Sequence, residues 1–241
     1  MVARAMGLRE RLADAGWFVV RPSHVAQPMA WRPGFVPTWV ALTVLTLIAV
    51  LLARGLIEAG LGPSGILPAS TRTARPDLRD VMLAVVVAPL LEEALSRGWL
   101  SGRRAALRFA LYGAAALGLL LAALASPPDL RRIVALAAVV TVFAGLIQWS
   151  LTSHRAADRA VPGWFIRRFH WLAWGSSLAF ALLHLGNYEA LTHPLGVLVV
   201  MPLMLGGMLL AYTRTRLGLR AAMAQHAAYN AVLVGTSFAL G

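Results

Sequence analysis

The sequence predicts an all-α protein, a multi-pass bundle of transmembrane helices, and three observations carry that prediction. Hydrophobic residues make up 59% of the 241 residues, charged residues only 13%, and the mean hydropathy is +0.70. A soluble domain would carry about a quarter charged residues, so this composition indicates a membrane protein. Apolar segments separated by loops with arginine and proline then predict about seven spans, because one crossing needs about 20 apolar residues.

Two missing residue types exclude several chemistries. The chain has no Cys and no Lys. This excludes disulfides, thiol nucleophiles, thiolate metal ligands, Ser–Lys dyads, Schiff bases and a Walker A lysine. The net charge of +12 comes from arginine. In so apolar a chain, arginines that border the spans report membrane orientation, so we expect a lipid bilayer and no nucleic acid among the partners.

The first 37 residues are expected to lie at the membrane surface. Residues 1–20 alternate arginine with apolar residues, a pattern that predicts an interfacial amphipathic helix. They do not resemble a signal peptide, because no uninterrupted apolar core follows the first charges. Residues 21–37 contain four prolines and Trp31, which favour an irregular segment at the level of the lipid headgroups.

Residues 38–241 are predicted to form one membrane domain without a soluble domain or a repeat of fixed period. The expected spans are 38–57, 80–101, 105–125, 133–151, 169–186, 194–212 and 219–241. With these spans, fifteen of the 22 basic residues fall on the side of the N-terminus and five on the other side. The positive-inside rule then predicts a cytoplasmic N-terminus. The Ala- and Arg-rich, Lys-free composition suggests a bacterium, hence its inner (cytoplasmic) membrane. Arg54 lies close enough to a span end to snorkel.

Ionisable residues inside spans are candidates for function, and each needs a partner. Three of the expected spans supply five ionisable side chains and one amide: Glu92, Glu93, Arg97, His184, His226 and Asn230. Glu93 and Arg97 stand four residues apart, in the order that favours a helical ion pair. Glu92 points about 100° away from Glu93 on the same helix and is left for another role.

The histidines bring further groups into the same set. The spacing of four residues places His184 on one helix face with Phe180, and His226 on one face with Asn230. A carboxylate can take a proton from water, a histidine can hold and shuttle it, and His with Asn can donate to a developing oxyanion. These groups are sufficient to hydrolyse an amide bond without a protein nucleophile.

The motifs Glu92-Glu93-x-x-x-Arg97, Phe180-x-x-x-His184 and His226-x-x-x-Asn230 occur in this order on apolar helices. They resemble those of the CPBP family of intramembrane glutamic endopeptidases. This family includes the CAAX prenyl endopeptidases and bacterial relatives linked to bacteriocin processing or self-immunity. The resemblance covers roughly residues 80–240, and Pro89 and Gly98 beside the first motif agree with it.

The resemblance implies a role for each candidate residue and no cofactor. Glu92 would be the base that activates water, with assistance from His184. His226 and Asn230 would form the oxyanion hole. Glu93 and Arg97 would support the first motif.

This chain also departs from the family pattern. Ser96 precedes Arg97, where the family usually has a bulky residue. Two extra spans, 105–125 and 133–151, separate the first motif from the second. The expected span limits put His184 toward the outer end of its span and His226 near the inner side. Either the helix that carries His184 is displaced or broken, or these limits are wrong by several residues.

Several alternatives stay open. A zinc site could be built from Glu92, His184 and His226. H-E-x-x-H is missing, and all Asp residues lie outside the spans or at their edges, which argues against site-2 and aspartyl types. A rhomboid-like serine near Ser176 and Ser177 would leave the glutamates unexplained. A catalytically silent scaffold or self-immunity protein of the same fold is the main alternative function, and a proton-coupled transporter is the second.

The sequence therefore predicts an intramembrane endopeptidase that cuts a hydrophobic or membrane-anchored peptide. Glu92-activated water would attack the scissile carbonyl.

Overall fold

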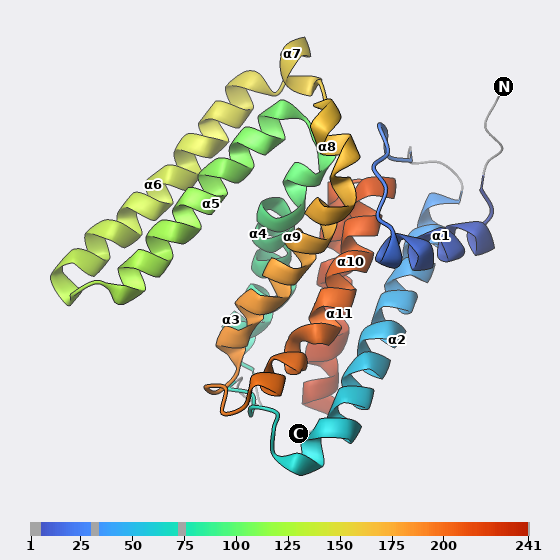
Figure 1. Cartoon of the computed structure of the whole chain (residues 1–241), viewed down its shortest axis with the longest axis vertical. Helices are drawn as coiled ribbons and strands as arrows, with labels where there is room; N and C mark the ends of the chain where they lie inside the picture. Colours follow the sequence, from blue (N-terminus) through green and yellow to red (C-terminus); the bar gives the residue numbers. More distant parts are fainter. Residues whose placement is uncertain (1–5, 30–33, 72–75, 241) are drawn as a thin grey trace. The chain divides into compact units, whose positions relative to one another are not determined.

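The computed structural model describes residues 6–29, 34–71 and 76–240 (Figure 1). Within these residues the backbone forms helices, turns and one isolated antiparallel bridge between Ser70 and Tyr188. The all-α prediction is confirmed for this part of the chain. Of the predicted N-terminal segment, residues 1–5 and Trp31 lie outside the described residues.

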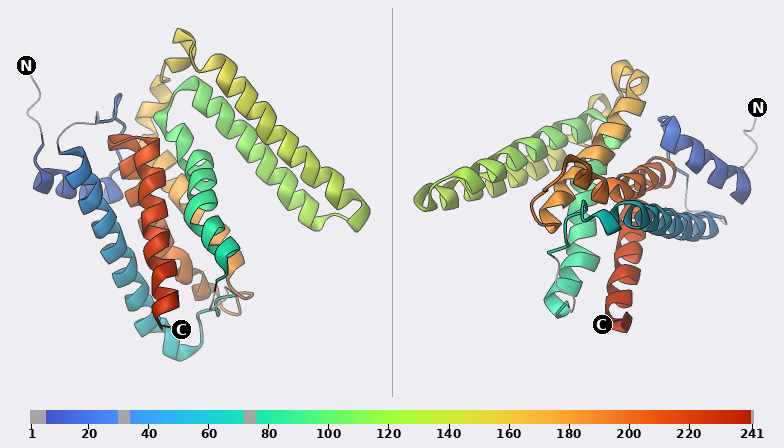
Figure 2. Two further views of the ribbon diagram at one scale, coloured as in Figure 1. Left: turned by 180° about the vertical axis from the view of Figure 1, so that it is seen from behind. Right: turned by 60° about the horizontal axis from the view of Figure 1, so that its bottom comes forward.

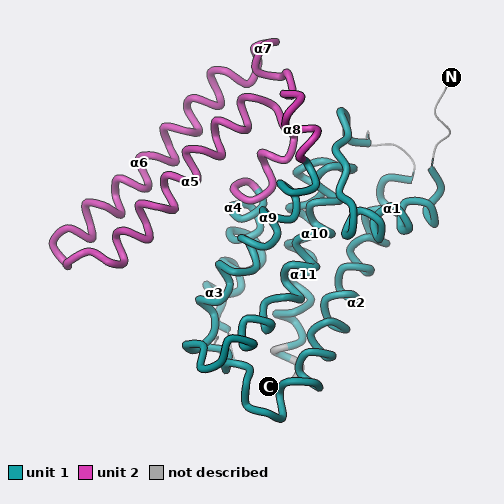
Figure 3. The backbone as a smooth tube through the Cα atoms, viewed as in Figure 1, with its two compact units in different colours: residues 1–93, 169–241 teal, residues 94–168 magenta. Residues whose placement is uncertain are grey.

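The chain divides into two compact units, which Figure 3 shows in different colours. The first unit comprises residues 1–93 and 169–241, and the second comprises residues 94–168. Helix α4 (Ala88–Arg97) crosses the division, because its residues up to Glu93 belong to the first unit. The other helices of the first unit are α1 (Leu8–Val20), α2 (Phe35–Leu61), α3 (Leu78–Met82), α9 (Phe169–Leu183), α10 (Met201–Arg216) and α11 (Leu219–Leu240).

Helix α10 is the central helix of the first unit. It packs against α2, α9 and α11, and most of its residues from Gly206 to Thr215 are buried. The left view of Figure 2 shows α2 and α11 beside each other, and the two helices are in contact. A Cβ at Gly206 would lie 3.1 Å from Cγ2 of Val50. The glycine therefore lets α10 approach α2 closely, as small residues do between membrane helices.

Helix α1 lies across the ends of α2 and α10 rather than along them (Figure 1). It buries Ala15 and Phe18 against the bundle and exposes Trp17 and Val20. These exposed apolar side chains lie opposite the packed face, and the amphipathic character stays a prediction. The helix is shorter than the predicted 1–20, and its place at a membrane interface stays a prediction.

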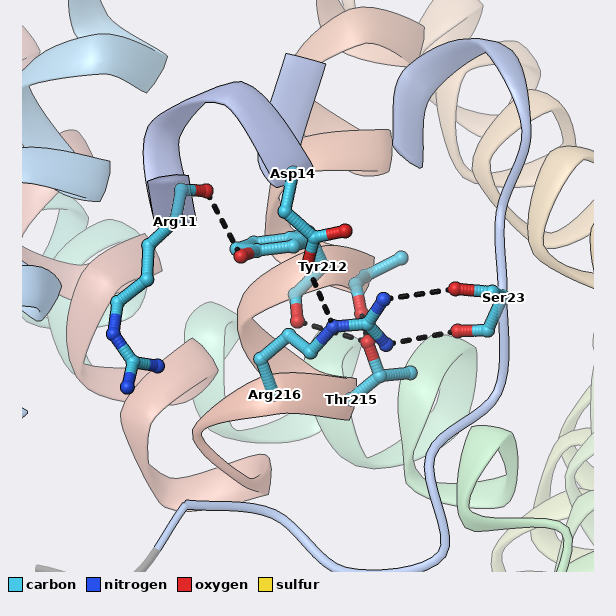
Figure 4. Close-up of polar contacts among 7 residues, drawn as sticks. Arg11, Asp14, Ser23, Tyr212, Thr215 and Arg216 are labelled. Atoms are coloured by element: carbon cyan, nitrogen blue, oxygen red, sulfur yellow. Dashed lines mark hydrogen bonds and ion pairs between the residues drawn. The ribbon is translucent and has the colours of Figure 1, made fainter. Parts of the chain in front are cut away.

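A cluster of polar contacts attaches α1 to the end of α10 (Figure 4). Nε of Arg216 donates to the Asp14 carboxylate at 3.0 Å. The two Nη atoms of Arg216 donate to the carbonyl and the hydroxyl of Ser23, at 2.9 and 2.8 Å. The hydroxyl of Tyr212 donates to the carbonyl of Arg11 at 3.0 Å. One arginine thus joins α1 and the segment that follows it to α10.

The second unit is built around a helical hairpin. Its helices are α5 (Arg104–Ala125), α6 (Pro128–Thr152), α7 (Ala156–Arg159) and α8 (Gly163–Arg167). A turn at Ser126 and Pro127 joins α5 to α6, and the two helices pack along each other. At the other end of the hairpin, Arg108 contacts Asp158 at 2.7 Å and donates to the Thr152 hydroxyl at 3.1 Å.

Four helical segments of the described residues are long and apolar enough to cross a membrane: Phe35–Ser64, Arg104–Ala125, Pro128–Thr152 and Pro194–Arg216. They correspond to four of the predicted spans. The three remaining predicted spans are helical but shorter, interrupted or more polar. The predicted total of about seven spans is therefore not confirmed.

The three remaining segments differ from simple spans for separate reasons. Segment 80–101 contains a π-helical turn (Leu83–Val87) and ends in a 3₁₀ turn (Gly98–Ser101). Helix α9 has only 15 residues. Helix α11 carries Gln225, His226 and Asn230, which lower its hydropathy.

The hairpin of the second unit predicts the effect of a methyl group at Gly145. A Cβ there would lie 2.7 Å from Cβ of Tyr112, an atom held by its own backbone. We expect Gly145→Ala to lower the free energy of unfolding by about 1–3 kcal/mol through overpacking. Gly118→Ala is the matched control, because nothing lies within 4 Å of its Cβ position. Thermal unfolding in detergent followed by circular dichroism compares the two; equal stabilities would contradict the packing.

The Arg216 cluster predicts a local change at the N-terminus. Arg216→Ala removes hydrogen bonds of a charged group, which each contribute about 1.5–3 kcal/mol. We expect amide hydrogen exchange over residues 8–29 to accelerate about tenfold or more. Arg9→Ala, at an exposed arginine of α1, is the control and should leave exchange unchanged. Equal exchange rates in both variants would show that the cluster does not hold α1.

Candidate active site

Three of the predicted residues converge in the first unit. Oε2 of Glu92 in α4 lies 4.0 Å from Nε2 of His184 and 3.8 Å from Nε2 of His226. His184 opens the 3₁₀ turn His184–Asn187 that follows α9, and His226 belongs to α11. The Glu92 side chain is 34% exposed, whereas those of His184 and His226 are 16% and 6% exposed. A partly open carboxylate thus faces two more deeply placed imidazoles.

The end of α9 explains how His184 reaches this place. The predicted span 169–186 extends past the α-helix, which ends at Leu183. The chain then turns at His184, so the side chain leaves the helix end instead of continuing along its face. The expected limit was wrong by three residues. The predicted difference in depth between His184 and His226 does not prevent both from lying close to Glu92.

The contacts of Nδ1 assign the proton on each imidazole ring. Nδ1 of His184 lies 2.8 Å from the carbonyl oxygen of Phe180, which can only accept, so this nitrogen donates. Nδ1 of His226 lies 3.0 Å from Oε1 of Glu93, and an ionised carboxylate also only accepts. When the rings are neutral, both Nε2 atoms therefore carry the lone pair, and both face Glu92. The Phe180 ring packs against both rings.

Glu93 has a contact that the sequence did not predict. It is fully buried, and its carboxylate holds His226, whereas the sequence pattern paired it with Arg97. Arg97 is also fully buried, but it belongs to the second unit, and its pairing with Glu93 stays a prediction. The adjacent glutamates differ in exposure, because Glu93 lies inside the protein and Glu92 at its partly open side.

Asn230 lies one helical turn after His226, as predicted, but its amide has a structural partner. Its Nδ2 donates to the carbonyl of Ala84 at 2.7 Å. Ala84 belongs to the π-helical turn that precedes α4. The second proton on Nδ2 is not used by this bond, so Asn230 can still donate to a substrate.

Sequence patterns did not single out the residues that hold α11 against α2. Nε2 of Gln225 donates to the Thr46 hydroxyl at 2.8 Å and to the Leu42 carbonyl at 3.3 Å. One turn earlier in α11, the Ala221 carbonyl accepts from the Trp39 indole at 2.9 Å. Gln225 and His226 are adjacent and point about 100° apart, so one faces α2 and the other faces Glu93. A buried amide beside a candidate histidine is the signal that could have found this contact.

Among the described residues, no group of three or more His, Asp or Glu side chains is arranged to hold a metal ion. The arrangement of the described residues thus gives no support to the alternative of a zinc ion on Glu92, His184 and His226.

One comparison with known proteins identifies a family. The sequence model described as Type II CAAX prenyl endopeptidase Rce1-like matches residues 75–232. The match includes all six candidate residues, from Glu92 to Asn230. No curated protein and no solved structure matches the chain.

The geometry predicts different stability effects for the two glutamates. Glu93→Ala leaves the buried Nδ1 of His226 without its acceptor and should lower the free energy of unfolding by about 1–3 kcal/mol. Glu93→Gln keeps an acceptor oxygen and should retain most of that stability. Glu92→Ala, at the partly exposed side chain, should change stability by less than about 0.5 kcal/mol. Thermal unfolding of the three variants measures this order, and an equal loss for both alanine variants would contradict it.

Proposed function

Because the chain belongs to the Rce1-like type II CAAX prenyl endopeptidase family, we propose that it is an intramembrane endopeptidase that uses Glu92-activated water. The family is one of proteases, and the apolar helices indicate a membrane protein. The observation that carries the finer proposal is the convergence of the His184 and His226 Nε2 atoms on the Glu92 carboxylate. The proposed substrate is a hydrophobic or membrane-anchored peptide.

Glu92 is the proposed general base. Its partial exposure allows water to reach the carboxylate. The carboxylate takes a proton from the water molecule while the water oxygen attacks the scissile carbonyl. His184 presents a lone pair on Nε2 because the Phe180 carbonyl holds its Nδ1 proton. His184 is thus suited to assist Glu92 by accepting and returning a proton. The proton finally passes to the leaving amine, and the peptide is released as an acid and an amine.

His226 and Asn230 are the proposed oxyanion donors. Nδ1 of His226 already donates to Glu93, so Nε2 can donate only when the ring carries both protons. The buried Glu93 carboxylate holds the ring in this orientation through its contact with Nδ1. Asn230 supplies its second amide proton. Donors of this kind typically contribute about 10²–10³-fold to the rate of acyl transfer.

We also propose a location in a bacterial inner membrane with a cytoplasmic N-terminus. The support is the distribution of arginines along the predicted loops and the Lys-free composition. No cofactor is proposed, since water, Glu92 and the two histidines suffice for the hydrolysis.

Cleavage of quenched peptides by the reconstituted protein tests this function. We expect Glu92→Gln to lower the cleavage rate by about 10²–10⁴-fold, as removal of a general base does. Glu58→Gln is the matched control, because Glu58 is an exposed glutamate of the same unit that pairs with Arg54. Its rate should equal that of the wild type.

Other outcomes separate the alternatives. Equal rates for the wild type and Glu92→Gln over a panel of hydrophobic and lipid-anchored peptides would sink the proposed mechanism. Loss of activity with a chelator and its return with zinc would favour the metal site. A Glu92→Gln protein that keeps full cellular function would favour a scaffold, and proton uptake into vesicles without cleavage would favour a transporter.

A further inference from the structure

The carbonyl of Ala84 has lost both of the backbone partners that a helix would offer it. In an α-helix this oxygen would accept from the N–H of Ala88, but that N–H donates to the carbonyl of Leu83. In a π-helical turn it would accept from the residue five positions on, which is Pro89, and proline has no N–H. The combination of the π turn and Pro89 therefore leaves one carbonyl to be satisfied from outside the segment.

Asn230 of α11 supplies the missing donor. Its Nδ2 lies 2.7 Å from the Ala84 oxygen. A carbonyl freed by proline in an apolar environment costs free energy unless another helix provides a donor. Asn230 shares its helix face with His226, which contacts Glu93. Helix α11 thus contacts residues 84–93 at two points: Asn230 bonds to Ala84, before Pro89, and His226 bonds to Glu93, after it.

We propose that Pro89 and Asn230 together form a positioning device that sets the orientation of Glu92 and Glu93 toward His226 and His184. The π turn inserts one extra residue ahead of α4, which rotates the residues that follow by about 100° relative to a continuous α-helix. Pro89 is buried three residues before Glu92 and prevents Ala84 from being satisfied within the π turn. Asn230 then fixes the turn against α11. The role of the device in catalysis rests on the proposed function, whereas its role in the fold does not.

The proposal predicts that the energetic effects of substitutions at Pro89 and Asn230 are coupled. Pro89→Ala restores an N–H at position 89, which can bond to the Ala84 carbonyl in the π register. Asn230 is then no longer required as a donor. The cost of removing the Asn230 amide must therefore depend on whether residue 89 is a proline, and a double-mutant cycle measures that dependence.

The experiment compares thermal unfolding of the full chain in one detergent for four proteins: wild type, Asn230→Ala, Pro89→Ala and the double variant. In the wild type, Asn230→Ala should lower the Tm by about 2–4 °C, the shift that one hydrogen bond represents at this size. In the Pro89→Ala background, the same change should lower the Tm by less than about 1 °C.

Gln225→Ala provides the matched control. Gln225 is also an amide of α11, but it donates to Thr46 and Leu42 of α2. Its effect on the Tm should be the same in both backgrounds. If Pro89→Ala fails to fold, Pro89→Val keeps more of the buried volume and also supplies an N–H. An equal fall for Asn230→Ala in both backgrounds overturns the proposal.

Cleavage of the same quenched peptides separates this proposal from the proposed function. We expect Pro89→Ala to lower kcat about 10- to 100-fold with little change in KM, because misplaced catalytic groups slow the chemical step. If the effect of Asn230→Ala on the Tm depends on residue 89 but no cleavage depends on Glu92, the proposed function is contradicted and the structural role of Pro89 and Asn230 is supported. Additive Tm values in an active enzyme, with unchanged kcat for Pro89→Ala, would sink the device alone.

Discussion

The hydrogen bond between His226 and the buried Glu93 is the contact on which the candidate site depends. It joins residues 133 positions apart in the sequence, and the distance from Nδ1 of His226 in α11 to Oε1 of Glu93 in α4 is 3.0 Å. Because it occupies Nδ1, it determines which nitrogen of His226 faces Glu92. The neighbouring Gln225 fixes the other side of α11 to α2. The rotation of α11 thus decides how the His226 imidazole and the Asn230 amide lie relative to Glu92 of α4.

The same requirement, that a polar group inside an apolar protein must have a partner, explains features along the whole chain. Several threonine hydroxyls donate to the carbonyl one turn earlier: those of Thr38, Thr43, Thr46, Thr141, Thr152 and Thr215. In this way a threonine can occupy an apolar helix without an unsatisfied hydroxyl. The Thr46 hydroxyl has a second contact, because its oxygen also accepts a hydrogen bond from Nε2 of Gln225. The Gln225–Thr46 bond thus joins α11 to α2, whereas these other threonine hydroxyls are satisfied within their own helices.

The sequence was sufficient for features that depend on local composition. Apolar runs located the long helices. The spacing of Glu92, His184, His226 and Asn230 identified candidate groups, and two of them, His184 and His226, lie close to Glu92. Spacing within one helix could not show the partners across helices. Glu93 was assigned to Arg97 because they are four residues apart, while its contact with His226 depends on how α11 is rotated. The sequence also could not predict the π turn, because an apolar run is compatible with both α-helical and π-helical geometry.

The attachment of α1 through Arg216 has a consequence for the biogenesis of the protein. Arg216 and Asp14 are separated by 202 positions, so the docking of α1 must wait until α10 has been synthesised. Contacts this distant in sequence carry the largest loop-closure entropy and form late. Until α10 has been synthesised, Asp14 and Ser23 lack the arginine that holds them. A docked α1 therefore indicates that α10 has been synthesised and has reached its place in the bundle.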